Sequence, residues 1–363
     1  MAMQTRSAKS TQSRNSLPGK VQTVLGPIEP ENLGVTITHE HLLIDLACYF
    51  EMPEEASERA WVDAPLTMDR LGGAMARWNY SRDNHQLLDE RMAVKEVLPF
   101  KLWGGGSVVD ATSIGIARDP LALQRISRAT GLNVIMGASH YVPVSHPPDM
   151  DRRSEDSIAD TTIRDITAGV GDTGVRSGII GEVGNFWPTS DNQLKVLRAS
   201  AHAQRETGAP ILIHPGFHPD SPPHIIRTLD RAGADLSRVI MGHLDVFTDL
   251  SWYRDLADTG CMLEWDGFGS EDTALHAVAH QSTEMMSDVQ RMTIIQHLIE
   301  AGFGGRILVA HDVCTKHQYR HYGGKSFGHI LENIVPRMRK RGFTETQINA
   351  ILVKNPARVL TFK

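Results

Sequence analysis

Cysteine is scarce in this sequence, which has three among 363 residues: Cys48, Cys261 and Cys314. The number is odd and no two cysteines have CxxC spacing, so the sequence does not predict a disulfide framework. A chain without disulfides is typical of a reducing compartment, and we expect a cytoplasmic location. Cys314 stands two residues after Asp312, and we expect it to pack in the core rather than to act as a nucleophile.

Long apolar runs and an excess of positive charge are also missing. No stretch approaches 18 apolar residues, so nothing in the sequence predicts a membrane span. The 37 lysines and arginines are outnumbered by 43 acidic residues, a balance that argues against nucleic acid as a partner. Residues 1–20 are rich in serine and contain arginine, but they lack the apolar segment of a secretory signal. We expect a disordered tail there, with a transit peptide as the alternative.

What the sequence does contain is a regular alternation of short apolar runs with longer amphipathic ones. Continuously apolar strands are typical of a parallel sheet that is covered on both faces. Eight strand–helix units predict a (β/α)₈ barrel, the TIM-barrel fold, as a single domain over residues 21–363. The predicted strands are Val35–Thr38, Ser107–Thr112, Val134–Ala138, Gly178–Glu182, Ile211–His214, Val239–His243, Cys261–Trp265 and Ile307–Asp312.

Three of the intervening helices are marked by the residues at their ends. They are predicted at Asp191–Thr207, at Pro222–Ala232 and from Asp119 to Gly131, and each stops at a glycine. Two longer segments interrupt the regular pattern. An insertion from about Ala47 to Tyr80 is expected to cover the mouth of the barrel, and a basic, glycine-rich loop is expected over Thr315–Gly328.

The first predicted strand ends on His39, Glu40 and His41. Side chains alternate along a strand, so the two histidines share one face and the glutamate takes the other. Neutral imidazole is a common ligand for zinc and similar ions. By itself, the pair is equally consistent with hydrogen-bonded polar residues at a strand end, and the other strand ends have to decide.

Four further strands also end on residues of the kind that bind metals: Glu182, His214, His243 and Asp312. The intervals between them are 32, 29 and 69 residues, which correspond to one, one and two strand–helix units. All six side chains are therefore expected at the C-terminal face of the barrel, where barrel enzymes have their active sites. Four imidazoles and two carboxylates on one ring predict a metal site, with two ions.

The chemistry of such a site follows from the donors. Two cations about 3.5–4 Å apart can share a hydroxide that is a nucleophile at neutral pH, while one cation polarises a carbonyl or phosphoryl oxygen. Asp312, beside that hydroxide, can accept its proton and pass it to the leaving group. Imidazole and carboxylate favour zinc, with manganese, cobalt or iron as alternatives.

Several long strings carry a family resemblance: GKVQTVLG, THEHL, GIIGEVG, LIHPG, LVAHD, YGGKSFGHIL and the terminal LTFK. They resemble the phosphotriesterase family of the amidohydrolase superfamily, and within it the phosphotriesterase-related proteins of animals, the N-acetyltaurine hydrolase group. The resemblance runs from Gly19 to Lys363. It implies a metal-dependent hydrolase with two ions. The implied ligands are His39, His41 and Asp312 for the more buried ion, His214 and His243 for the more exposed ion, and Glu182 as the bridge.

Two departures and one shared residue bear on mechanism. Many family members bridge the ions with a carboxylated lysine, whereas this chain has Glu182, like the glutamate-bearing branch of the family. Tyr141 matches a tyrosine that lactonases of the family place beside the two ions, and we expect it to contact substrate and assist catalysis with Asp312. Phe217 stands where the animal proteins have an arginine, so the substrate is expected to differ from N-acetyltaurine if that arginine holds an anion.

The expected reaction is hydrolysis of an N-acyl amide, either N-acetyltaurine-like or a related amide or ester. A lactonase and a phosphotriesterase or phosphoesterase are the alternative enzymes, and a non-enzymatic metal-binding barrel is the remaining class. The basic loop after Asp312 suits an anionic substrate, with a solvated surface loop as the alternative. A homodimer is expected by resemblance. The expected substrate contacts are Tyr141, Phe217, Trp265, Lys316, Arg320 and Lys325.

Overall fold

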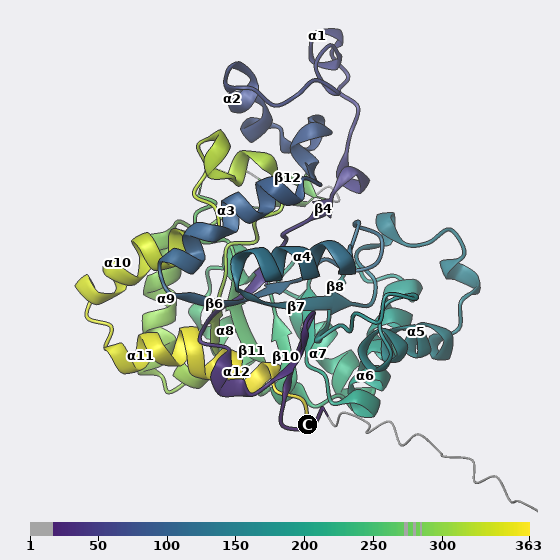
Figure 1. The fold of residues 1–363 in the computed structure, drawn as a ribbon, viewed down its shortest axis with the longest axis vertical. Helices are drawn as coiled ribbons and strands as arrows, with labels where there is room; N and C mark the ends of the chain where they lie inside the picture. The colour runs from purple at the N-terminus through teal and green to yellow at the C-terminus, as the bar shows by residue number, and fades with distance from the viewer. Residues whose placement is uncertain (1–16, 272–274, 279–280, 284) are drawn as a thin grey trace, which may run out of the picture.

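Eight parallel strands form the centre of the structure, a computed structural model that describes residues 17–271, 275–278, 281–283 and 285–363. They lie in the order β14-β11-β10-β9-β8-β7-β6-β3, and helices surround them (Figure 1). The predicted TIM barrel is confirmed, and each predicted strand overlaps an observed one. The barrel strands are β3 (Val35–Glu40), β6 (Gly105–Asp110), β7 (Asn133–Ala138), β8 (Ile179–Gly184), β9 (Ile211–His214), β10 (Val239–Met241), β11 (Met262–Trp265) and β14 (Ile307–Val309).

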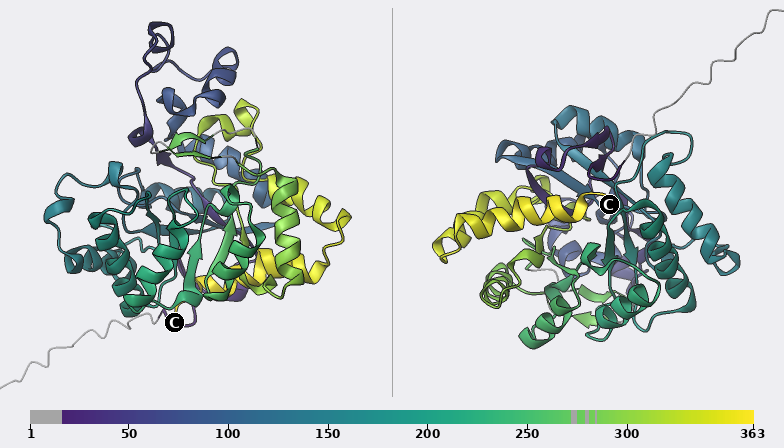
Figure 2. Two further views of the ribbon diagram at one scale, coloured as in Figure 1. Left: turned by 180° about the vertical axis from the view of Figure 1, so that it is seen from behind. Right: turned by 90° about the horizontal axis from the view of Figure 1, so that it is seen from below.

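Helices follow the strands around the outside of the barrel, as the view from below shows (Figure 2). The predicted helix at Asp191–Thr207 has the observed bounds of α6, and the helix predicted at Pro222–Ala232 is shifted by one residue. The outer helices are α3 (Glu90–Leu102), α4 (Pro120–Thr130), α5 (Glu155–Thr167), α6 (Asp191–Thr207), α7 (Ser221–Arg231), α8 (Leu250–Asp258), α9 (Asp288–Glu300), α10 (Val335–Lys340), α11 (Glu345–Asn349) and α12 (Asn355–Leu360).

Alternation along the strands separates the interior of the barrel from the helix layer. In β11, Met262 and Glu264 face the interior, whereas Leu263 and Trp265 pack into the core beneath the helices. A layer of apolar side chains fills the interior on the N-terminal side of the polar strand ends, so those ends rest on a packed core. This layer includes Val109, Ile135, Ile179, Leu212, Ile240, Met262 and Leu308.

The insertion after β3 stands on the C-terminal face of the barrel. Its helices α1 (Ala56–Arg59) and α2 (Met68–Ala76) project away from the strands at the top of Figure 1 and in the left view of Figure 2. At its base, β4 (Ile44–Asp45) pairs antiparallel with β5 (Gln86–Leu87). The insertion therefore begins and ends beside the strand ends that carry the candidate ligands.

The two ends of the described chain meet at the opposite face. Gly19 N donates a hydrogen bond to Phe362 O at 2.8 Å, and Phe362 N donates to Lys20 O at 2.8 Å. Gly19 and Lys20, which fall within the range predicted as a tail, are therefore attached to the barrel. Residues 1–16 lie outside the described part of the chain. The remaining short strands are β1 (Val21–Thr23), β2 (Gly26–Ile28), β12 (Leu275–Val278) and β13 (Gln281–Thr283).

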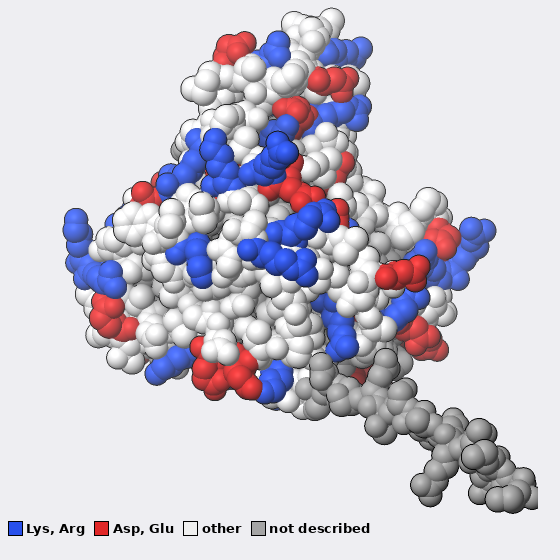
Figure 3. Space-filling view, in the orientation of Figure 1, with Lys and Arg blue, Asp and Glu red and all other residues white. Residues whose placement is uncertain are grey.

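The surface carries both signs of charge. Acidic and basic side chains are interspersed over the face shown in Figure 3. Among the described residues, no helix has the length and apolar content needed to cross a bilayer.

Candidate metal centre and its pocket

Six polar side chains from five strand ends converge at the C-terminal face, and Glu182 of β8 lies at their centre. Its Oε1 atom is 3.2 Å from His41 Nε2, which is also 3.3 Å from Asp312 Oδ1. Its Oε2 atom is 3.2 Å from His214 Nδ1 and 3.4 Å from His243 Nε2. The two oxygens of one carboxylate thus face two different groups of donors, the arrangement that a bridging ligand requires.

His39 points the same way. Its Nε2 atom is 3.3 Å from Glu182 Oε2, is buried, and has no hydrogen-bond partner. Its Nδ1 atom lies 3.2 Å from Glu264 Oε2 and 3.1 Å from Asp266 Oδ2. A ring that donates Nδ1–H to a carboxylate has its lone pair on Nε2, so this orphaned atom is ready to bind a cation.

The same logic assigns the tautomers of two more rings. The Thr112 hydroxyl donates to Leu43 O at 2.9 Å, so its oxygen accepts a hydrogen bond from His41 Nδ1, also at 2.9 Å. Asp266 Oδ1 accepts from His243 Nδ1 at 2.9 Å. Both rings therefore have their lone pair on Nε2, as metal-binding histidines do. That of His41 faces Glu182 and Asp312, and that of His243 lies 2.7 Å from His214 Nδ1.

Negative charge surrounds these rings. Burial acts to lower the pKa of His41, but hydrogen bonds and charge from Asp312 and Glu182 raise it to about 9. Burial likewise opposes protonation of His39, yet Asp266 and Glu182 hold the pKa of that ring well above its usual value. A field that favours a proton also favours a metal cation, so the donors and their surroundings fit divalent ions.

The backbone at Asp312 is held in an uncommon conformation. Its φ is 49°, in the left-handed region that costs a residue with a side chain about 1–3 kcal/mol. Asp312 N donates to His39 O at 3.1 Å, and Gln318 Nε2 donates to Asp312 O at 2.9 Å. Glu40, on the other face from the paired histidines, accepts hydrogen bonds from the amides on either side of Asp312 at 2.9 and 3.1 Å. Four hydrogen bonds therefore hold the main chain around Asp312, and with it the direction in which the Asp312 side chain projects.

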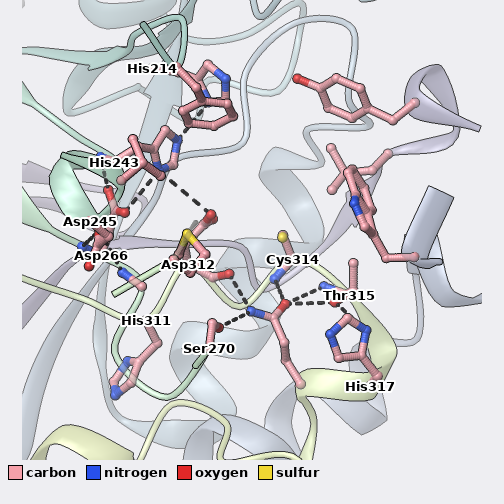
Figure 4. A pocket seen from close by; sticks show the side chains of 18 of the residues that line it. His214, His243, Asp245, Asp266, Ser270, His311, Asp312, Cys314, Thr315 and His317 are labelled. Carbon is pink, nitrogen blue, oxygen red and sulfur yellow. Dashed lines mark hydrogen bonds and ion pairs between the residues drawn. The ribbon is translucent and has the colours of Figure 1, made fainter. Parts of the chain in front are cut away.

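A cavity of about 740 Å³, counted up to its open mouth, lies over the ring. Figure 4 shows His214, His243 and Asp312 along its floor and Thr315 and His317 on another side. The apolar part of its lining is formed by Leu46, Tyr49, Trp78, Tyr141, Phe217, Val246, Met285 and Cys314. A polar floor between apolar walls is typical of a small-molecule site.

Two of the six predicted substrate contacts line this cavity. Tyr141 places its hydroxyl 3.3 Å from His214 Nδ1 and accepts a hydrogen bond from Tyr49 Oη at 3.2 Å. Phe217 lies with its ring centroid 5.5 Å from that of His214 and 5.9 Å from that of His243. Both residues therefore stand beside the candidate ligands of the more exposed ion.

The other four do not line it. Trp265 faces outward from β11 and packs against Tyr253 of α8, because side chains alternate along the strand and Glu264 takes the interior position. Lys316 Nζ is 2.6 Å from Asp83 Oδ1.

Two basic side chains of the same loop also lie apart from the cavity. Arg320 is paired with Glu332. Lys325 lines a neighbouring cavity. We correct the expectation for Trp265 and the three basic residues accordingly, and the argument for an anionic substrate loses its support.

Sequence reasoning missed several residues of the site. Glu264 and Asp266 hold two candidate ligands, and their spacing at the end of the seventh strand was the same i, i+2 signal as at the first. Tyr49 and Trp78 come from the irregular insertion, where no periodicity points to a position in space. Cys314 packs against the core, as expected, and also lines the cavity.

Thr112 provides a test of the ring assignment. Replacing it by valine removes the acceptor for His41 Nδ1–H, so we expect metal affinity to fall about 10–100-fold. Thr112→Ser keeps the hydroxyl and should bind metal like the wild type. Metal content after dialysis against graded chelator measures the difference. Equal retention by the valine variant would contradict the proposed tautomer of His41.

Comparison with known proteins places this geometry in context. The phosphotriesterase family model matches residues 19–360. The human protein named N-acetyltaurine hydrolase is 42% identical over 351 residues, covering 96% of this chain and 100% of the relative. A resiniferatoxin-binding protein from Rhodobacter sphaeroides superposes with a TM-score of 0.90 at 32% identity, covering 97% of this chain and 98% of the other. A lactonase from Listeria monocytogenes gives a TM-score of 0.76 at 25% identity, covering 95% and 99%.

Proposed function

The chain belongs to the phosphotriesterase family, and from this premise we propose that it is a hydrolase of N-acyl amides that binds two divalent ions, with zinc as the favoured metal. The observation that carries the proposal is the set of inward-directed imidazole nitrogens around Glu182, beneath a cavity with apolar walls. The choice of an amide rests on the relatives named N-acetyltaurine hydrolase, to which this chain is 40–42% identical. The ring ligands in the proposal are His39, His41, Glu182, His214, His243 and Asp312.

Two ions held by these residues would supply a water-derived nucleophile at neutral pH and a Lewis acid for the carbonyl oxygen. The chain itself supplies the proton transfer. The Asp312 side chain is 26% exposed and lines the cavity, whereas that of Glu182 is 2% exposed. Asp312 is therefore placed to take a proton from the attacking water and return it to the leaving nitrogen.

Tyr141 is placed to orient the substrate. Burial raises the pKa of its phenol well above the usual value, so the hydroxyl keeps its proton. Tyr49 donates to its oxygen at 3.2 Å, so the Tyr141 hydrogen faces its other neighbour, His214 Nδ1 at 3.3 Å, and can turn from there toward the carbonyl oxygen of a substrate. In this proposal the tyrosine pair stabilises the negative charge that develops on that oxygen.

A lactonase is the second candidate, because Tyr141 stands beside the ring and the Listeria relative is named a lactonase. A lactone differs from an N-acyl amide in its leaving group, which is an alkoxide instead of an amine. Both substrates present the same carbonyl to the ring, so only turnover separates them.

The test is turnover by the purified protein with metal content measured alongside. The panel contains N-acyl amides, simple lactones and an aryl phosphotriester. Cleavage of N-acyl amides with about two ions per chain is the expected result. Cleavage of lactones alone would replace the proposal by its second candidate, and two ions without any turnover would refute both.

Location, oligomeric state and domain organisation complete the proposal. We propose a cytoplasmic homodimer in which residues 21–363 fold as one domain. Cell fractionation tests the location. Light scattering on the purified protein tests the dimer, and limited proteolysis followed by calorimetry tests the single domain.

A further inference from the structure

The lining of the cavity contains a feature that the reaction alone does not explain: its charged groups are nearly all acidic. Among the described residues that line it, none is lysine or arginine, whereas Asp245, Asp266 and Asp312 all do so. The part of the lining that the structure describes therefore offers no lysine or arginine to a substrate.

The basic residues around the site are engaged elsewhere. Lys316 Nζ lies 2.6 Å from Asp83 Oδ1. Arg291 is fully buried between Asp245 and Asp288, with Nη1 3.1 Å from Asp288 Oδ1. Each cation is paired with a carboxylate of the protein, and Arg291, whose Nη2 atom has no hydrogen-bond partner, is fully buried outside the lining of the cavity.

The histidine on the polar side of the cavity does not replace them. His317 is buried, and burial lowers the pKa of its ring to about 4. Its Nδ1 atom lies 3.0 Å from Asn84 Nδ2, and its backbone N donates to Asn84 Oδ1 at 2.9 Å. At neutral pH this ring is a fixed, uncharged hydrogen-bonding group.

Apolar side chains form much of the remaining lining. Tyr49 and Trp78 of the insertion pack edge to face, with ring centroids 5.7 Å apart, and line one wall. Phe217 and Val246, from the loops after β9 and β10, line another. A chain of methylene groups lying between these walls would be removed from water, which is favourable, whereas a sulfonate or carboxylate there would lose its hydration without gaining a partner.

We propose that the substrate is uncharged on both sides of the scissile bond and carries an apolar acyl chain longer than acetyl. This inference rests on the proposed amide hydrolysis and narrows it. The acyl chain lies between the Tyr49–Trp78 wall and Phe217, and the polar side of the leaving group meets Thr315, His317 and Gln318. Small anionic amides are poor substrates of this chain.

Matched substrates test the charge. N-acetyltaurine is compared with its methyl sulfone analogue, which has nearly the same shape without the negative charge, and the N-hexanoyl forms of both are added. We expect kcat/KM to be at least about tenfold higher for each sulfone than for its sulfonate, and higher for hexanoyl than for acetyl. Equal or greater turnover of the sulfonates would overturn the inference and leave the amide hydrolase standing. No turnover of any of the four by the metal-loaded protein would overturn the proposed function itself.

Variants of Phe217 give a second readout. Phe217→Arg places a cation on the wall beside His214 and His243, so it should shift the sulfone-to-sulfonate ratio of kcat/KM toward the sulfonate by about tenfold. Phe217→Gln opens the same space without charge and should leave that ratio near the wild-type value. A ratio that changes equally in both variants would show that the ring acts through shape alone. A selective loss of sulfonate turnover in Lys316→Met would show that a cation outside the cavity serves the substrate, and would also overturn the inference.

Discussion

Replacing Asp312 by asparagine is expected to lower kcat about 10²–10⁴-fold, because the amide cannot accept the proton that the reaction releases. The substitution suits the backbone. Asparagine tolerates the left-handed region better than most residues, so it can adopt the φ of 49° at this position. The hydrogen bonds from Gln318 and to Glu40 involve the main chain near Asp312 and remain available. The fall in kcat is measured with the best panel substrate, and thermal unfolding checks that the fold is retained.

Asp83 offers a matched control. Its side chain is 26% exposed, the same fraction as that of Asp312, but it pairs with Lys316 and does not line the cavity. Asp83→Asn should keep kcat within a small factor of the wild type. An Asp312→Asn protein that is folded, loaded with metal and as active as the wild type would remove Asp312 from the mechanism.

Changing Glu182 to glutamine is expected to remove metal and activity together. The replacement keeps the volume of the buried side chain, but it loses one negative charge and turns an amide NH₂ group toward imidazole nitrogens that lie 3.2–3.4 Å from the carboxylate. Losing a residue that only orients a metal ligand already lowers metal affinity about 10–100-fold, and we expect at least the upper end of that range here. Metal analysis after dialysis and the rate at saturating substrate provide the measurement.

Glu182→Lys tests whether residue 182 bridges the two ions or only lies near them. Wild-type protein stripped of metal should recover its rate without added bicarbonate, because its bridging carboxylate is encoded in the sequence. Glu182→Lys should lose both its metal and its catalytic rate. Any recovery should require bicarbonate, which allows the amine of the lysine to be carboxylated. Retention of both metal and rate by Glu182→Lys in bicarbonate-free buffer would show that residue 182 does not contact the ions.

The barrel and the candidate ring could be predicted because both follow from local rules. Strand alternation gives the faces of His39 and His41, and parallel strands bring their C-terminal ends together. The same rule, applied to the seventh strand, would have placed Glu264 inside and Trp265 outside. The position of Trp265 at a strand end, taken alone, instead predicts a pocket wall.

The lining of the cavity could not be predicted in this way. Lys316 pairs with Asp83, a residue 233 positions away in the sequence, and no local pattern encodes that contact. Tyr49 and Trp78 belong to a segment without strand or helix periodicity, so their direction depends on how the insertion docks. Substrate contacts are set by such long-range pairings, whereas ligand positions are set by strand geometry.

The insertion over residues 47–80 has a consequence for how this scaffold can diversify. It contributes Tyr49 and Trp78 to the wall of the cavity, yet it supplies no strand to the barrel and no ligand to the ring. Mutations there can therefore alter which acyl groups fit while the hydrolytic apparatus stays intact. A lineage can explore new substrates in this segment at little risk to folding, and exchange of the whole insertion between paralogues would transfer selectivity as a module.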